Sequence, residues 1–174
     1  GTYNESIVLN KPNITVKSTA GAAATIIDPP LGTLTIGVQI LKNMGVVTFE
    51  GFTVQNFTES GIVQSMGNRE GTTFHVINNI IKPAADYLRN GIQVSGDGST
   101  VIGNEVYGAR LTDDWLSTGI MVVHASNVVV SGNTIIAPAL GMDIGFGILD
   151  WNLASGLSNI TITNNTIVGV DYPL

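Results

Sequence analysis

The chain has 174 residues, of which 44% are hydrophobic and only 11% are charged, with 21 glycines and no cysteine. The lack of cysteine excludes disulfides and thiolate metal sites, and the net charge of −6 argues against nucleic acid as a partner, because phosphates attract clustered lysine and arginine. No apolar run approaches the roughly 18 residues of a membrane span, so we expect no membrane insertion. The mixture of glycine, asparagine and β-branched residues favours short strands and tight turns in a single domain over residues 1–174.

A repeat runs along most of the chain. The dipeptide Gly-Ile recurs at positions 61, 91, 119 and 147, in steps of 30, 28 and 28 residues. Each dipeptide is followed, later in the same repeat, by a marker asparagine (Asn79, Asn104, Asn133 and Asn165). Phe52 occupies the equivalent position one repeat before Asn79. Apolar residues stand three positions before each of these markers (Phe49, Val76, Val101, Val130, Ile162) and two positions after it (Val54, Ile81, Val106, Ile135, Ile167). Repeats of this length with two or three short strands are typical of the coils of a solenoid.

The repeat divides the chain into six predicted coils, at 1–30, 31–60, 61–90, 91–118, 119–146 and 147–174. The first coil is the least regular, because Ala20–Ala24 interrupts the alternation, and we place its strands by Ile7, Ile14, Val16 and Ile26. The opening Gly1–Tyr3 leads directly into strand. No segment has the apolar period of a capping helix, so we predict a solenoid without evident end caps.

The recurring asparagines mark the corners between strands. Asparagine tolerates a left-handed backbone, and its amide can bond to the same residue one coil away. The predicted ladder contains Asn79, Asn104, Asn133 and Asn165, flanked inside by ladders of Val and Ile. The alternative is that these asparagines are exposed turn residues. Their common register with two apolar columns favours the ladder.

The pattern G-I-x-V…N-V-x-V-x-x-N-x-I resembles the single-stranded right-handed parallel β-helix of the pectate-lyase-like superfamily. The opening segment, GTYNESIVLNKPNITVKSTAGAAATIID, is similar to the first coils of secreted β-helix proteins, including NosD-type and carbohydrate-binding or sugar-hydrolase repeats. The resemblance covers essentially the whole chain and implies an all-β fold of about six coils. It is specific for the fold and unspecific for the activity.

In this superfamily, clefts lie on an outer sheet and are walled by loops that leave the corners. The chain has loops with acidic and aromatic residues before each Gly-Ile dipeptide. Aromatic faces stack on sugar rings, and carboxylates bind hydroxyls or Ca²⁺. The sequence therefore predicts a saccharide-binding edge, formed by Asp86, Tyr87, Arg89, Arg110, Asp113, Asp114 and Trp115. The alternative is structural: aspartates that tighten turns, and aromatic rings that shelter the edge of the core.

Metal binding and catalysis are less strongly indicated. Asp113, Asp114 and Asp143 can supply oxygen ligands to Ca²⁺, although no cofactor is required by the pattern. The His-Gly, Arg-x-Lys and Asp-Pro-His-Glu motifs of related enzymes are absent. Of the outward strand positions predicted beside the apolar columns, only His75 and Glu50 carry side chains capable of acid–base chemistry (Thr48, His75, Thr100, Val129, Thr161 and Glu50, Ile77, Ile102, Ser131, Thr163). We therefore predict no catalytic residue.

Five Asn-x-Ser/Thr sequons are present, and in a glycosylating host they would mark an extracellular surface. They begin at Asn4, Asn13, Asn56, Asn159 and Asn164.

Two functions are compatible with these features. Uncapped ends and bland faces favour an extracellular or cell-surface structural or adhesive module that associates end to end with other copies of itself, as a filament, sheath or surface-layer subunit. A charge of −1 over residues 1–110 and −5 over residues 111–174 gives the two ends a weak electrostatic contrast. The alternative is a polysaccharide-binding or polysaccharide-cleaving β-helix of the lyase or hydrolase type.

Overall fold

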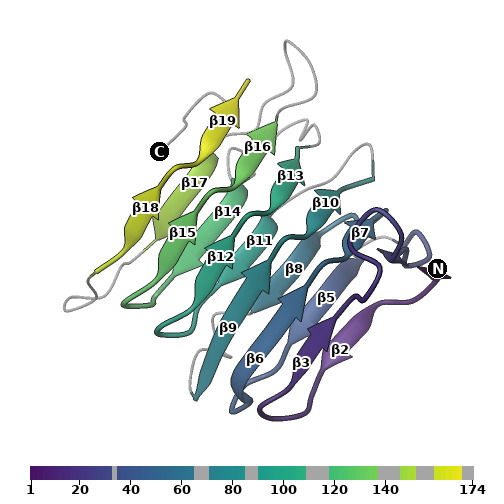
Figure 1. Ribbon diagram of the computed structural model, residues 1–174, viewed down its shortest axis with the longest axis horizontal. Helices are drawn as coiled ribbons and strands as arrows, with labels where there is room; N and C mark the ends of the chain where they lie inside the picture. The colour runs from purple at the N-terminus through teal and green to yellow at the C-terminus, as the bar shows by residue number, and fades with distance from the viewer. Residues whose placement is uncertain are drawn as a thin grey trace.

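The structure is a computed structural model that describes residues 1–32, 35–64, 71–84, 90–108, 118–136, 146–151 and 159–169. These residues form short strands joined by turns, and they contain no helix. Every strand pairs in parallel with the strand three places away in the chain, so each coil contributes one strand to each of three sheets (Figure 1). The architecture is the predicted all-β parallel solenoid.

Sheet A contains seven strands: β1 (Thr2–Tyr3), β4 (Ile26–Ile27), β7 (Thr53–Gln55), β10 (Ile80–Lys82), β13 (Glu105–Tyr107), β16 (Thr134–Ile136) and β19 (Thr166–Val168). Sheet B contains six: β2 (Ile7–Leu9), β5 (Ile36–Ile40), β8 (Ser60–Gln64), β11 (Asn90–Val94), β14 (Thr118–Val123) and β17 (Phe146–Trp151). Sheet C contains six: β3 (Thr15–Lys17), β6 (Gly45–Glu50), β9 (Thr72–Ile77), β12 (Thr100–Ile102), β15 (Val129–Ser131) and β18 (Thr161–Thr163). Six or seven strands per sheet agree with the predicted stack of about six coils.

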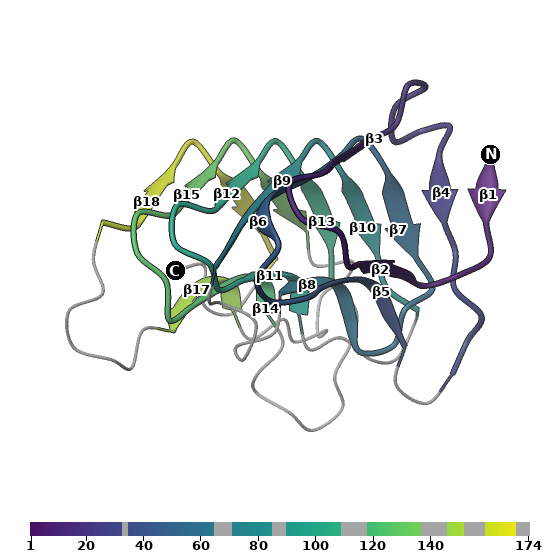
Figure 2. The ribbon, with the colours of Figure 1, turned by 90° about the horizontal axis from the view of Figure 1, so that it is seen from below.

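The three sheets surround the interior of the solenoid (Figure 2). The core in this interior is a set of aliphatic ladders. Strand pairing aligns both predicted apolar columns residue by residue, one along sheet C and one along sheet A. The middle members, such as Val101 and Ile135, are completely buried. At about 25 cal/mol per Å² of buried apolar surface, such ladders are the main favourable contribution to folding.

The predicted asparagine ladder is present at the corner between sheets C and A. The Nδ2 of Asn104 donates to Oδ1 of Asn133 (3.0 Å) and to the carbonyl oxygen of Val76 (2.9 Å). Asn79 and Asn133 repeat this pattern toward Asn104 and Asn165, and the first three members of the ladder are at most 1% exposed. The exposed-turn alternative is therefore wrong.

One detail of the ladder differs from the sequence prediction. The left-handed residue at the corner is the residue before the ladder position, as at Asn78 (φ 53°), Gly103 (φ 66°), Gly132 (φ 66°) and Asn164 (φ 55°). The ladder asparagines do not themselves have positive φ. Their amides must point into the stack, and the preceding residue makes the turn that directs them there.

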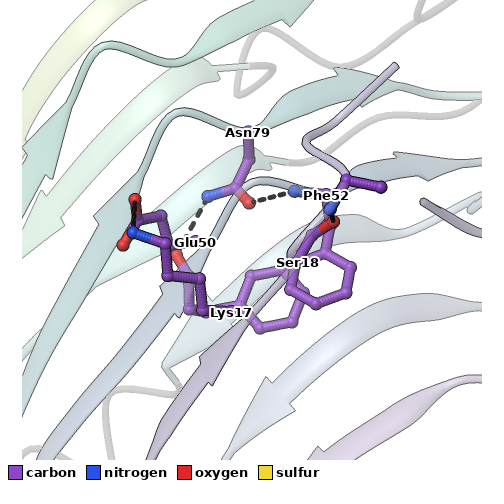
Figure 3. A network of polar contacts seen from close by, with 7 residues as sticks. Lys17, Ser18, Glu50, Phe52 and Asn79 are labelled. Atoms are coloured by element: carbon purple, nitrogen blue, oxygen red, sulfur yellow. Dashed lines mark hydrogen bonds and ion pairs between the residues drawn. The ribbon is translucent and has the colours of Figure 1, made fainter. Parts of the chain in front are cut away.

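The ladder changes composition toward the N-terminal end. At the second coil, the backbone N–H of Phe52 donates to Oδ1 of Asn79 (3.0 Å), and the Phe52 ring stacks on Phe49 with centroids 4.5 Å apart (Figure 3). In the first coil the corner contains Ser18 and Thr25, whose hydroxyls lie 2.6 Å apart. An aromatic pair and a hydroxyl pair thus replace the amide in these two coils.

The glycine of each Gly-Ile repeat is the second residue of its strand in sheet B. A Cβ atom on Gly91 would lie 2.6 Å from the carbonyl oxygen of Gly119 and 2.4 Å from Cγ1 of Val106. Gly61 and Gly37 meet equivalent contacts. Any side chain here would collide with the next coil, and this explains why the dipeptide recurs.

The outermost described coils enclose the core less completely. Ile14 and Val16 of the first coil, and Ile162 and Ile167 near the last strands, point inward but are only partly buried. Their counterparts in the middle coils are completely buried. That residues 1–174 form one domain without end caps stays a prediction.

Candidate functional site

A recess of about 400 Å³ lies on the outer face of sheet B, over β2 and β5. Val8 and Gln39 are aligned on these two strands and point outward, because their neighbours Leu9, Val38 and Ile40 are buried in the core. The recess is lined by Ser6, Ile7, Val8, Pro30, Thr35, Ile36 and Gln39. It therefore combines an aliphatic surface with two hydroxyls and one amide.

The wall of the recess consists of Pro30 and Thr35, which lie between β4 and β5, and local contacts hold these residues in place. Thr58 supports Thr35: the N–H of Thr35 donates to Oγ1 of Thr58 (2.9 Å), and the N–H of Thr58 donates to the carbonyl oxygen of Thr35 (3.1 Å). The hydroxyl of Thr58 also donates to the carbonyl oxygen of Gly32 (3.0 Å). Pro29 and Pro30 have a fixed φ angle. A wall restrained in this way loses little entropy when a ligand binds.

The base of the same segment is fixed by an aspartate. The carboxylate of Asp28 accepts one hydrogen bond from Nε2 of Gln55 (2.9 Å) and another from Nδ2 of Asn56 (2.6 Å). This carboxylate belongs to the corner between sheets A and B and is not among the residues that line the recess. Its part in the site is to hold the wall.

A line of amides continues along the outer face of sheet B. Gln93 is aligned with Gln39 through Val63, and so it lies about 10 Å from Gln39, at two strand spacings. Nδ2 of Asn90 donates to Oε1 of Gln93 (2.8 Å), and Nε2 of Gln93 donates to the carbonyl oxygen of Gln64 (3.0 Å). The Oδ1 atom of Asn90 is buried without a hydrogen-bond partner in the described part of the chain. Asn90 and Gln93 are each only 8% exposed, so these amides bond to one another and to the backbone and are scarcely accessible to solvent.

The outer face of sheet C has the two columns predicted from the sequence, with the same alignment. Nδ1 of His75 lies 2.9 Å from Oγ1 of Thr100, and burial lowers the pKa of the imidazole. Glu50 forms an ion pair with Lys17 at 2.8 Å (Figure 3). Both side chains are thus engaged with a neighbour on the same sheet.

The outer face of sheet A holds a small polar cluster. The Tyr107 hydroxyl donates to the Glu105 carboxylate, and this bond raises the pKa of Tyr107. The Lys82 ammonium lies 5.4 Å from the centroid of the Tyr107 ring. The cluster stabilises the surface of β10 and β13 through a cation–π contact and a hydrogen bond.

The predicted saccharide-binding edge and the predicted Ca²⁺ ligands fall outside the described residues. This applies to Asp86, Tyr87, Arg89, Arg110, Asp113, Asp114, Trp115 and Asp143. Within the described ranges, no group of three or more His, Asp or Glu side chains is placed to hold a metal ion. Saccharide and Ca²⁺ binding at these residues stay predictions.

The five sequon asparagines all lie in the described chain, at or near corners. Asn4, Asn13, Asn159 and Asn164 are exposed, while Asn56 is half-buried and bonded to Asp28. All but Asn4 have positive φ. Their glycosylation stays a prediction.

The recess itself was not predicted from the sequence. Its residues belong to the first two coils, where the repeat is least regular and where the dipeptide reads Gly37-Val38 instead of Gly-Ile. The available signal was the pair of polar residues, Thr35 and Gln39, on either side of this variant dipeptide. A comparison of each coil's outward residues would have drawn attention to them.

Comparison with known protein families matches residues 36–171 to the right-handed beta helix region, over more than three quarters of the chain. The chain belongs to the right-handed β-helix family. For this β-helix, no significant match was found to a curated protein or to a solved structure. The family agrees with the parallel solenoid and with the resemblance to the pectate-lyase-like superfamily.

None of the residues described in the structure belongs to a helix with the length and hydropathy needed to cross a bilayer.

Proposed function

We propose that this β-helix is an extracellular or cell-surface adhesive module that binds polysaccharide, without cleaving it, on the outer face of sheet B. The observation that carries the proposal is the recess over β2 and β5. Its volume of about 400 Å³ lies within the range of small-molecule sites, about 300–1,000 Å³. Sugar rings have apolar faces and hydroxyl edges, and the recess offers both kinds of contact.

The open part of this face lies at its N-terminal end. Val8 is 49% exposed and Gln39 is half-buried, whereas Val63 and Gln93, which continue the column of Gln39 along the axis of the solenoid, are only 6% and 8% exposed. The recess would therefore contact a short stretch of a polysaccharide at Val8 and Gln39. The predicted loop edge, including Trp115 and the predicted Ca²⁺ ligands, stays a second candidate for the saccharide site.

Affinity electrophoresis through gels containing different polysaccharides tests this proposal. At least one polysaccharide should retard the wild-type protein, and Gln39→Leu should weaken that retardation at least tenfold. Trp115→Ala tests the loop edge in the same gels, and Thr134→Val, on the outer face of sheet A, is the control. Migration unaffected by every polysaccharide contradicts the proposal, and retardation sensitive only to Trp115→Ala moves the site to the loop edge.

We also propose self-association end to end, as in a filament, sheath or surface layer. The support is the partly exposed inward residues of the outermost described coils, together with strand edges that have no paired strand in the described ranges. Stacking a second copy there would bury these residues and continue the three sheets. Electron microscopy over a concentration series should show rods that lengthen with concentration. Rods of one length at every concentration would exclude this association.

A further inference from the structure

We infer that the recess over β2 and β5 selects an uncharged saccharide and disfavours uronic acids. The inference rests on the proposed polysaccharide binding and specifies its ligand class. It follows from three features of the described residues: the chemistry of the lining, the charges beside it and the rigidity of its wall.

The lining contains only uncharged side chains. The outward aliphatic part comes from Val8 and Pro30, and the polar part comes from Ser6, Thr35 and Gln39. Ile7 and Ile36 border the recess from strand positions that alternate inward, and Ile7 packs against the core. The Gln39 amide can both donate to and accept from a sugar hydroxyl, and each hydroxyl side chain can do the same. A uronate carboxylate would lose water on entering the recess and would gain no cationic partner from these seven residues.

Two acidic residues adjoin the lining, whereas the lysines Lys11 and Lys42 stand three residues beyond Val8 and Gln39 along the chain. Glu5 precedes Ser6, and Glu59 follows Thr58, the residue that supports the wall. The backbone N–H of Glu59 also donates to the carbonyl oxygen of Thr35 (3.0 Å), which fixes Glu59 close to the lining. Carboxylates at these two positions repel a second carboxylate nearby, whereas they have little effect on a neutral ring.

The wall has little freedom to rearrange around a larger or charged ligand. Thr35 is held by hydrogen bonds to Thr58 and Glu59, and Asp28 is held by two amides. A pre-formed site favours ligands that fit it without distortion. The selectivity therefore resides in the fixed lining.

Isothermal titration with matched oligosaccharides tests this inference. The probes are neutral tetrasaccharides of glucose, mannose and galactose, and tetragalacturonate of the same length. At least one neutral tetrasaccharide should bind at least tenfold more tightly than tetragalacturonate at low salt. Neutral binding should change less than twofold between low and high salt, because no ion pair contributes to it.

Three variants connect the selectivity to the recess. Thr35→Val keeps the side-chain shape and should weaken neutral binding at least fivefold, while Thr134→Val on sheet A should leave it unchanged. Glu59→Gln should strengthen tetragalacturonate binding and leave neutral binding unchanged. Gln39→Leu provides a second lining variant if the melting temperature of Thr35→Val shows that it is unfolded.

The outcomes separate the two proposals. Tighter binding of tetragalacturonate than of every neutral probe would overturn the inference and leave the proposed polysaccharide binding in place. Neutral binding that is insensitive to both Thr35→Val and Gln39→Leu would also overturn it, by placing the ligand elsewhere. Lack of binding by all four probes, in a protein that no polysaccharide gel retards, would overturn both proposals.

Discussion

The asparagine corner and the recess on sheet B show two different uses of one repeat. At the corner, four coils carry the same residue, and each amide bonds to the next coil. Around the recess, Thr35 and Gln39 occur once, in a coil where the Gly-Ile dipeptide has changed. Positions that repeat therefore support the stack, and positions that depart from the repeat are where a ligand can be distinguished.

Removing one amide from the middle of the ladder should have the largest effect. Asn133 accepts two bonds from Asn104 and donates to Asn165 and to the carbonyl oxygen of Val101. Asn133→Ala leaves these buried groups unpaired and should lower the free energy of unfolding by about 3 kcal/mol, measured by urea denaturation. A loss below about 0.5 kcal/mol would mean that the ladder contributes little to stability. Thr35→Val, at the recess, should leave stability within about 0.5 kcal/mol of wild type.

Filling the glycine column should have an intermediate effect. Gly91→Ala places a Cβ 2.6 Å from the backbone oxygen of Gly119, and so the two coils must move apart. Overpacking of this kind should cost about 2 kcal/mol, measured as the change in urea midpoint at constant m-value. Gly1→Ala, where nothing lies within 4 Å, is the control. Equal stability of the two variants would show that the coils adjust freely.

The smallest effect concerns the pH dependence at His75. Burial lowers the pKa of His75 in the folded state, so the unfolded chain binds a proton more readily. The stability associated with neutral His75 is complete above the unfolded pKa of about 6.5 and is lost as the pH falls through the lower folded pKa. His75→Gln should therefore reduce the fall in melting temperature between pH 7 and pH 5. An identical fall in both proteins would contradict this origin.

Much of the fold could be predicted because residues that contact one another in adjacent coils of a solenoid recur at a nearly fixed spacing in the sequence. The columns through Val101 and Ile135, the ladder and the outward columns of sheet C could all be read by aligning the markers. The position of the left-handed residue could not be predicted, because asparagine occurs both at the turn, as Asn78, and in the ladder, as Asn79. The recess could not be predicted either, because it depends on contacts, such as that of Thr35 with Thr58, between residues that are not part of the repeat pattern.

The ladder is also directional, and this has a consequence for engineering. In Asn79, Asn104 and Asn133, the amide nitrogen donates to the asparagine oxygen of the following coil as well as to a carbonyl oxygen of the preceding coil. Each of the four amide oxygens accepts from the preceding coil. A duplicated segment 104–132, inserted before Asn133, would meet the same donor on one side and the same acceptor on the other. Each added coil would lengthen the solenoid by about 4.8 Å. The number of added coils would therefore set the distance between the recess and the residues that follow the insertion.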